Sequence, residues 1–468
     1  MNNEEKSFAK ELKENLFMNP KSGLQRISED ELKKADEFCE GYKKFLDYSR
    51  TERDAVKYSI DLLKKEGFTE YDPEKAYSAG DKVYVNNRNK ALMAAVIGKQ
   101  GVKEGASLAI AHIDSPRIDL KPSPLYEANN LALFKTHYYG GIRKYQWLAM
   151  PLALHGVVCK TDGTVVYVSF GDDENEPCLC ITDLLPHLAQ EQAEKPLRKA
   201  FNGEDLNVIV GSRPVSCDDE GELVKLNAMY LLNKKYGITE DDFLSAELCL
   251  VPTYKTRDVG FDGGLMGGYG HDDRCCAYPA LMAVIEAGVP DKTAITVLCD
   301  KEETGSDGNT GMQSDYLRYF IYDLAKADGV EGYHALSKSK CLSADVNAAY
   351  DPTYASCFEA KNSSYVNEGV VISKYTGHGG KGGTSDASAE YMGEIRTMLE
   401  KNEILWQVGE LGRVDLGGGG TIAKYVANMN VDVVDLGVPV LSMHAPFELI
   451  SKVDIYMAKK AFAALFAR

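Results

Sequence analysis

The stretch SLAIAHIDSP, residues 107–116, is an apolar run that ends in a histidine and an aspartate. Residues 107–113 are nearly all apolar, which is typical of a central strand covered on both faces. Residues two apart in a strand face the same side, so Asp114 can support the ring that His112 presents to a ligand. By itself the pair is weak, because a hydrogen-bonded histidine at a strand end has the same pattern.

Apolar strand patterns alternate with helical patterns on both sides of this stretch. Strands are predicted at 82–86, 91–97, 294–298 and 339–346 and within 431–441, and helices at 272–287, 313–327, 386–398 and 454–467. Ser28 with Glu31, and Thr51 with Asp54, have N-cap spacing and predict two further helices near the N-terminus. The sequence therefore predicts an α/β fold with a central mixed, mainly parallel sheet wrapped by helices.

The region between about residues 121 and 251 has a different pattern of predicted secondary structure. It contains a predicted hairpin, with strands at 155–159 and 165–170, followed by a charged stretch at 183–201 that we expect to be helical. His112 and Asp272 stand on either side of this region. If both belong to one site, the chain between them must loop out, so we predict an inserted β-rich domain at 121–251 and a discontinuous domain formed by 1–120 plus 252–468.

The amino-acid composition indicates which classes of binding partner and which cellular compartment to expect. The 468 residues are 44% hydrophobic and 26% charged, as in globular proteins, and the net charge of −17 argues against nucleic acid and anionic membrane surfaces. The eleven cysteines have no framework spacing, which favours free thiols in a reducing compartment. The N-terminus resembles no signal peptide and no apolar window is long enough to span a bilayer, so we expect a cytoplasmic protein without a membrane partner.

Six side chains that can bind metal follow predicted strands or begin predicted helices. They are two imidazoles and four carboxylates: His112, Asp272, Glu302, Glu303, Asp345 and His444. This is the ligand inventory of a two-metal hydrolytic site, with one carboxylate left to transfer protons. Each residue alone has an ordinary alternative, such as a helix cap, a solvated glutamate, a turn residue or a core histidine. The joint pattern is what favours a metal site.

The adjacent glutamates in CDKEETGSDG, residues 299–308, directly follow a buried strand. Open α/β sheets place their sites at such strand ends, where neighbouring side chains diverge. We therefore predict that Glu302 is the general base and Glu303 a metal ligand. Two divalent cations would be neutralised by Asp272, Glu303, Asp345 and a hydroxide, which limits the cost of burying them.

Two glycine-rich segments resemble phosphate-binding loops without matching them. When HGGKGGTS, residues 378–385, is aligned with the phosphate loop through its Gly-Lys pair, the first glycine of that motif falls on position 375, which is Tyr375. The segment LGGGGT, residues 416–421, lacks the lysine of the motif. We predict that both form tight turns in the active site or structural loops.

Five motifs, in this order along the chain, resemble the aspartyl aminopeptidase family, which includes vacuolar aminopeptidase I: AHIDSP (111–116), GHDDR (270–274), DKEETGS (300–306), SADV (343–346) and LSMHAP (441–446). The GHDDR form, VISKYTG (371–377) and DLGGGGT (415–421) are closer to bacterial members. The resemblance covers essentially the whole chain. It implies a zinc-peptidase-like catalytic domain, an inserted domain for dimer assembly, and a homo-oligomer, usually a dodecamer built from dimers.

Carried over by position, the resemblance also implies metal-binding roles. His112 and Asp345 would hold one divalent ion, Glu303 and His444 the other, Asp272 would bridge them, and Glu302 would be the catalytic base. Zinc is the expected metal, and manganese and cobalt suit the same nitrogen and oxygen ligands.

Two further residues are assigned only by the resemblance. Lys374 is similar to the lysine that meets the acidic side chain of the substrate, and His187, in LLPHLA, to a histidine that the inserted domain lends to a neighbouring subunit. The alternatives are a surface lysine at a strand end and a structural helix histidine. The segment GHGGKGGTSDAS, residues 377–388, departs from the eukaryotic pattern and leaves a strict acidic preference open.

Together these observations predict a di-metal aminopeptidase that removes N-terminal residues from peptides, with a preference for acidic N-termini. A related di-metal carboxypeptidase or deacylase has the same ligand set. A non-catalytic assembly protein on a peptidase scaffold is the alternative of another class. The presence of every expected ligand and of the base argues against it.

Overall fold

A nine-stranded sheet forms the centre of the larger part of the molecule. The computed structural model describes residues 8–18, 22–216 and 221–467. In spatial order the sheet consists of β1 (Thr69–Glu70), β2 (Lys82–Asn87), β3 (Ala91–Val96), β14 (Ala294–Cys299), β4 (Ser107–His112), β15 (Lys340–Ser343), β21 (Asp432–Gly437), β17 (Val370–Ser373) and β19 (Trp406–Val408). Parallel and antiparallel pairs both occur, and the parallel ones predominate. The predicted mixed α/β fold is confirmed.

The four neighbouring strands β14, β4, β15 and β21 run parallel to one another. Every residue of β4 and of β14 is buried, as the apolar run around residue 110 predicted. Because parallel strands end at the same edge of a sheet, the residues that follow β14, β4 and β15 are brought close together.

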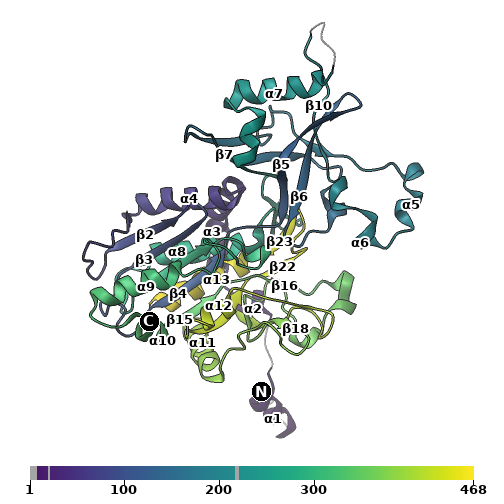
Figure 1. The fold of residues 1–468 in the computed structure, drawn as a ribbon. Coiled ribbons are helices and arrows are strands. Elements are labelled where there is room, and N and C mark those ends of the chain that lie inside the picture. Colours follow the sequence, from purple (N-terminus) through teal and green to yellow (C-terminus); the bar gives the residue numbers. More distant parts are fainter. Residues whose placement is uncertain (1–7, 19–21, 217–220, 468) are drawn as a thin grey trace.

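Helices cover both faces of this sheet (Figure 1). One face packs against α3 (Glu29–Tyr48), α4 (Glu52–Lys65), α8 (His271–Ile285), α11 (Ala389–Lys401) and α13 (Lys452–Phe466). The other face packs against α9 (Tyr316–Ala327), α10 (Gly332–Ser337) and α12 (Ala423–Ala427). Alternate residues of β4 serve the two cores, with Ala109 and Ala111 on one side and Leu108 and Ile110 on the other. This is the two-residue period of a strand buried on both faces.

Both predicted helix N-caps are present. The hydroxyl oxygen of Ser28 accepts a hydrogen bond from the backbone N–H of Glu31 at the start of α3. At the start of α4, Thr51 and Asp54 form a reciprocal capping box. Each cap satisfies N–H groups that the first helical turn leaves without partners.

A seven-stranded antiparallel sheet projects from the larger part (Figure 1). Its order is β8 (Val165–Phe170), β7 (Leu152–Cys159), β11 (Ala246–Pro252), β5 (Arg117–Ala128), β6 (Leu131–Tyr139), β10 (Val208–Gly211) and β9 (Cys180–Ile181). It has its own apolar core, to which α7 (Leu223–Tyr236) contributes. The predicted hairpin is the β7–β8 pair. The division of the chain at residues 121 and 251 stays a prediction.

The helical stretch expected at residues 183–201 is confirmed only in part. The segment contains only the single turns η2 (Pro186–Leu188), α5 (Gln190–Ala193) and α6 (Leu197–Ala200). Pro186 and Pro196 each stand at the beginning of a short turn. A proline lacks the N–H of an intrahelical hydrogen bond and favours the start of a helix, so Pro186 and Pro196 divide the segment into short pieces.

Two smaller sheets complete the fold near the ends of the parallel strands. One consists of β12 (Arg257–Val259), β13 (Leu265–Gly268), β23 (Glu448–Ser451), β22 (Pro439–Leu441) and β16 (Asn347–Ala348). The other is a two-stranded ribbon of β18 (Gly377–His378) and β20 (Gly418–Gly419). Helix α1 (Phe8–Leu16) has no buried residue and lies away from the body, before the short helix α2 (Gly23–Arg26) (Figure 1).

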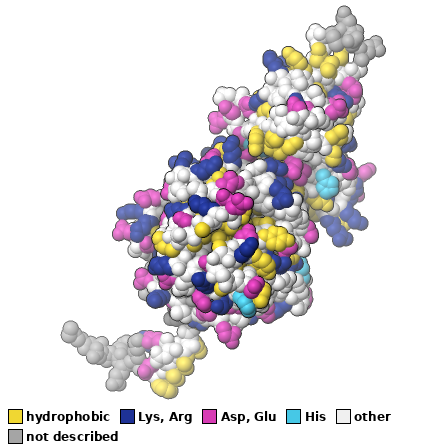
Figure 2. All heavy atoms as spheres, turned by 60° about the vertical axis from the view of Figure 1, so that its left-hand side comes forward, with side chains coloured by type: hydrophobic (Ala, Val, Ile, Leu, Met, Phe, Trp, Pro, Cys, Tyr) yellow, Lys and Arg dark blue, Asp and Glu magenta, His cyan; other side chains and the backbone are white. Residues whose placement is uncertain are grey.

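The surface and the cysteines agree with the composition. On the face shown in Figure 2, acidic and basic side chains are interspersed rather than gathered into one basic patch. The ten cysteines of the described ranges are free thiols, and Cys217 lies outside them. No helix in the part of the chain that the structure describes has both the length and the apolar character needed to cross a bilayer.

Candidate active site

The five predicted metal ligands and the predicted base, Glu302, meet at the carboxyl edge of the parallel strands. His112 ends β4, Glu302 and Glu303 open the short helix η5 (Glu302–Thr304) after β14, Asp345 follows β15, Asp272 lies at the start of α8, and His444 follows β22. The residues come from five separate places in the chain. The sheet order is what brings them together.

Asp272 lies between the two imidazoles. Its Oδ1 is 3.2 Å from His112 Nε2, and its Oδ2 is 3.2 Å from His444 Nε2. One carboxylate therefore directs one oxygen toward each histidine. This is the arrangement required of a ligand that bridges two cations.

Further carboxylates surround each imidazole. His112 Nε2 is 3.9 Å from Asp345 Oδ1 and 4.0 Å from Glu302 Oε2. His444 Nε2 is 3.5 Å from Glu303 Oε2. The ligand atoms of His112, Glu302 and Asp345 all lie within 4.8 Å of one another, and so do those of His112, Asp272 and Glu303.

Several of these atoms are buried without a hydrogen-bond partner among the described residues. They are His112 Nε2, Asp272 Oδ1 and Glu303 Oε1. Buried polar atoms normally find partners, because leaving one without a partner costs about 1–3 kcal/mol. Imidazole nitrogens and carboxylate oxygens are the donors that Zn²⁺ takes in proteins. The residues present therefore fit divalent cations.

Burial and neighbouring charges shift the pKa values of the cluster. Burial raises the pKa of Glu302 to about 7 and raises the pKa values of Glu303 and Asp345 well above their ordinary range. Burial lowers the pKa of His444, but the nearby Asp272 and Glu303 outweigh it and raise that pKa to about 11. Crowded buried carboxylates lose protons reluctantly unless cations stand between them.

Asp114 connects three parts of the site. Its carbonyl oxygen lies 3.0 Å and its carboxylate 3.3 Å from His112 Nδ1, which leaves Nε2 directed at Asp272. The same carboxylate accepts hydrogen bonds from the backbone N–H groups of Glu302 and Glu303, at 3.1 and 3.2 Å, and from the Tyr139 hydroxyl. The sequence predicted the contact with the histidine but not those with the glutamates.

Glu448 performs the equivalent task on the other side of the site. Its buried carboxylate accepts the backbone N–H of Asp272 at 3.1 Å and that of His444 at 2.8 Å. Burial raises the pKa of this group to about 8. Sequence reasoning missed Glu448. The available signal was an acidic residue four positions after the histidine of LSMHAP.

A cavity of about 400 Å³ opens beside the cluster. The candidate ligands Asp272, Glu303, Asp345 and His444 form part of its wall together with Glu302. The remaining wall includes residues 418–421 of the LGGGGT segment, and this segment meets the other glycine-rich segment in the β18–β20 ribbon. Gly418 has φ +120°, and a Cβ there would lie 2.2 Å from the carbonyl oxygen of Gly377. Only glycine allows this close approach.

Comparison with known proteins agrees with this geometry. A family model described as aminopeptidase I zinc metalloprotease (M18) matches residues 45–466. The chain belongs to the M18 family. The resemblance seen in the five motifs is thereby confirmed, and the protein is a metallo-aminopeptidase, a hydrolase of the zinc metalloprotease class.

Curated and solved M18 relatives match over nearly the whole chain. A probable M18 family aminopeptidase 1 of Clostridium acetobutylicum is 46% identical, over 95% of this chain and 97% of its own. The crystal structure of an M18 aminopeptidase from Thermotoga maritima has a TM-score of 0.91 and 41% identity, covering 96% of this chain and 99% of its own. Yeast aminopeptidase 1, at 20% identity and a TM-score of 0.76 over 92% of this chain and 97% of its own, shares the fold.

Lys374 of this M18 chain does not line the cavity of about 400 Å³ beside the cluster, which we call the main cavity. Its ammonium lies 2.5 Å from Asp386 Oδ1, and the lysine side chain is 43% exposed. The cavity wall instead contains a different lysine, Lys424, on α12. His187 is exposed in the short helix η2 of the seven-stranded sheet region, apart from the six-residue cluster of its own chain.

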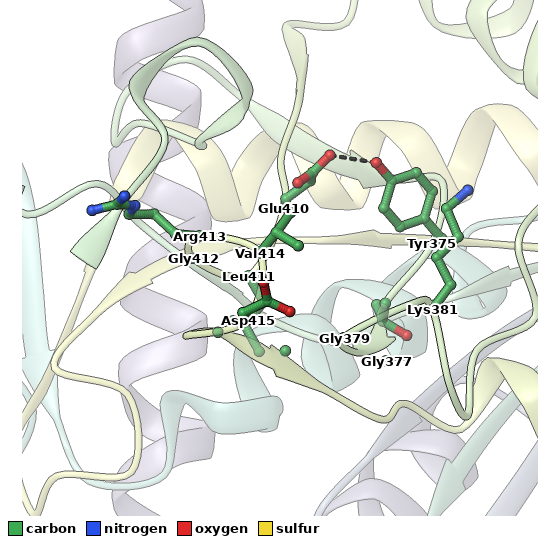
Figure 3. A pocket seen from close by; sticks show the side chains of 13 residues that line it. Tyr375, Gly377, Gly379, Lys381, Glu410, Leu411, Gly412, Arg413, Val414 and Asp415 are labelled. Carbon is green, nitrogen blue, oxygen red and sulfur yellow. Dashed lines mark hydrogen bonds between the residues drawn. The ribbon is translucent and has the colours of Figure 1, made fainter. Parts of the chain in front are cut away.

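A smaller cavity of about 50 Å³ adjoins the main one (Figure 3). The Tyr375 hydroxyl donates a hydrogen bond to Glu410 across it, and the Lys381 ammonium lies 3.7 Å from the centre of the Tyr375 ring. Thr376, Leu411 and Gly418 line both cavities. These contacts hold the glycine-rich ribbon of the M18 chain against the loop that carries Glu410.

Gly437 sets the position of Asp345 in this M18 chain, which gives the first prediction. A Cβ at Gly437 would lie 1.7 Å from the carbonyl oxygen of Asp345. We expect Gly437→Ala to displace that segment, lower the free energy of unfolding by about 1–3 kcal/mol and weaken metal binding. Thermal unfolding and metal content measure both effects.

Gly393→Ala is the matched control, because nothing lies within 4 Å of a Cβ at that position in α11. Alanine should stabilise this helix by about 0.5–1 kcal/mol and leave metal content unchanged. Equal behaviour of the two variants would contradict the role given to Gly437.

Proposed function

We propose that this chain hydrolyses the N-terminal peptide bond of peptides at a centre of two divalent cations. His112 and Asp345 would hold one ion, Glu303 and His444 the other, and Asp272 both. The observation that carries the proposal is the Asp272 carboxylate, with one oxygen directed at each of two imidazoles 3.2 Å away. Zinc is the first candidate metal, and manganese or cobalt would suit the same ligands.

The residues divide the chemistry between them. Bound divalent cations would polarise the scissile carbonyl and acidify the attacking water. Glu302 takes a proton from that water at its carboxylate and returns it to the nitrogen of the departing amine. Asp114 is a positioning residue, because it holds the backbone of Glu302 and the ring of His112.

The decisive experiment combines metal analysis with substrates blocked at one end. We expect purified protein to contain close to two divalent ions per chain and to release the first residue of a free peptide but not of its N-acetylated form. A carboxypeptidase would cleave the acetylated peptide at its other end, and a deacylase would release acetate. A protein with full metal content and no activity on any of these peptides would be an assembly protein on a peptidase scaffold.

Recognition of acidic N-termini belongs to this proposal and is assigned to Lys424. Lys424 lies in the cavity wall, and its ammonium, 4.7 Å from the Tyr425 ring centre, has no acidic partner among the described residues. Lys374 is already paired with Asp386. A charge-assisted hydrogen bond from Lys424 to a substrate carboxylate would favour aspartyl and glutamyl residues.

We therefore expect Lys424→Met to lower kcat/KM for aspartyl substrates about tenfold or more relative to leucyl substrates. Lys374→Met is the matched control and should leave that ratio unchanged. The opposite result would return the role to Lys374, and an unchanged ratio in both variants would remove the acidic preference. The aspartyl and leucyl substrates carry the same chromogenic leaving group and differ only in their first residue, so the ratio of their kcat/KM values reports recognition of the side chain.

The assembly proposed for this chain is a homo-oligomer built from dimers, with a dodecamer as the expected particle. Residues 121–251 would supply the dimer contact. Three exposed apolar residues on α7, namely Leu226, Tyr230 and Leu231, support an interface there. One solved structure of yeast aminopeptidase 1 is that of a dodecamer. His187 would reach a neighbouring subunit in such a particle. Light scattering of purified protein measures the number of subunits.

A cytoplasmic location and peptide substrates complete the proposal. The free thiols of the described chain suit a reducing compartment. The interspersed charges on the face shown in Figure 2 and the net charge of −17 argue against partners such as nucleic acid and anionic membranes. Cell fractionation followed by aminopeptidase assay tests the location.

A further inference from the structure

Asp435 is a buried acidic residue in the main cavity that the proposed metal centre does not use. It lies on β21, it is 4% exposed, and it forms part of the cavity wall. Its Oδ1 has no hydrogen-bond partner among the described residues. The residue belongs to neither group of ligand atoms around His112.

The sheet register places Asp435 beside the metal-binding edge. Asp435 pairs with Ser343 across the parallel strands β21 and β15. Asp345 follows Ser343 by two positions, and residues two apart in an extended chain face the same side. The carboxylates of Asp435 and Asp345 also interact electrostatically. Asp435 is thus adjacent to the cluster without being part of it.

The chain supplies no cation for this carboxylate. No lysine, arginine or histidine within the described ranges forms an ion pair with Asp435, and this includes Lys424, which lines the same cavity. Burying a carboxylate without a positive partner is costly, so such a group is expected to meet a cation from outside the protein. An ammonium group is small enough to enter the cavity, and a peptide with a free N-terminus carries one.

We propose that Asp435 binds the α-ammonium group of the first residue of the substrate. The inference rests on the proposed function, because only an exopeptidase acting at the N-terminus brings a free ammonium group to this wall. The contact would be a charge-assisted hydrogen bond from the ammonium to Oδ1. It would place the first residue with its carbonyl carbon over the metal cluster, and it would exclude peptides that lack a free amino group.

The test compares two inhibitors that differ only in the amino group. Leucine hydroxamate and its desamino analogue, 4-methylpentanohydroxamate, carry the same metal-binding group and the same side chain, so their affinity ratio isolates the ammonium. We expect the unaltered enzyme to bind leucine hydroxamate roughly 10- to 100-fold more tightly. In Asp435→Asn the ratio should fall to near one, with KM raised for a leucyl substrate more than kcat is lowered.

Asp432→Asn is the matched control on the same strand. Asp432 is exposed and pairs with Lys340 away from the cavity, so its replacement should leave the inhibitor ratio unchanged. Metal content is also measured in each variant. If Asp435 had a purely structural role, its replacement would reduce metal content and weaken the affinity of both inhibitors equally, so the ratio of their affinities would be preserved. Asp435→Ser repeats the measurement should the asparagine variant fail to fold.

The outcomes separate this inference from the function on which it rests. If the unaltered enzyme cleaves free peptides but the variants at position 435 keep the inhibitor ratio, only the role of Asp435 is overturned. An unaltered enzyme without activity on free N-termini overturns the proposed function itself. If the affinity ratio falls to near one in both Asp435 variants while the metal content is unchanged, the ammonium site is established.

Discussion

Glu302→Gln is expected to retain both metal ions and the unaltered fold while kcat falls about 10²- to 10⁴-fold. The amide has nearly the shape of the carboxylate but cannot accept the proton of the attacking water. The backbone contact from the N–H of Glu302 to Asp114 does not involve the side chain, so η5 should keep its position. Metal analysis, circular dichroism and steady-state kinetics on a leucyl substrate measure the three properties.

The neighbouring substitution Glu303→Gln is the control for this experiment. Glu303 Oε2 lies 3.5 Å from His444 Nε2, so the same chemical change one residue later should reduce metal content as well as turnover. A Glu302→Gln variant with near-normal kcat, or one that loses metal as Glu303→Gln does, would contradict the separate roles of the two glutamates.

Asp272→Asn is expected to abolish activity by removing the charge shared between the two ions. Burial opposes ionisation of Asp272, but the adjacent His112 and His444 outweigh it and hold its pKa below the usual range, so the residue is an anion in the folded protein. An amide offers only one oxygen and no charge, and the second ion then lacks a ligand. Metal content should fall to one ion per chain or fewer.

The same variant should lose the stabilisation that metal supplies. A ligand at a free concentration 1,000 times its Kd stabilises the folded state by about 4.1 kcal/mol. A chelator should therefore lower the unfolding midpoint of the unaltered protein reversibly, and Asp272→Asn should show little further response. Asp273→Asn is the matched control, because Asp273 is buried one residue away yet contacts neither imidazole within ion-pair distance. It should keep the metal-dependent shift.

Much of the fold follows from local sequence features. The apolar run at 107–113 and the N-caps at Ser28 and Thr51 correspond to β4, α3 and α4. These features depend on residues a few positions apart, so they survive in any tertiary context. The stretch at 183–201 forms short helices rather than one long helix because Pro186 and Pro196 interrupt it.

The site divides in the same way. The six candidate ligands could be selected because each follows an apolar run or opens a helix, and the structure brings all six together. Asp435 was not predicted because nothing near it in the sequence distinguishes it from other acids in strands, and Glu448 was missed although it stands four positions after His444. Lys374 was assigned to the substrate by resemblance, whereas its pairing with Asp386 depends on how the glycine-rich loop folds back.

The sequence by itself determined which side chains can bind a metal and that they stand at the ends of buried elements. Only the tertiary structure decided which oxygen meets which imidazole and which acids hold the ligands in place. The physical reason is the strand order β14-β4-β15-β21, which is not the order of the chain. Contacts such as His112–Asp272–His444 join residues far apart in sequence, and they exist only once those strands have paired in one register.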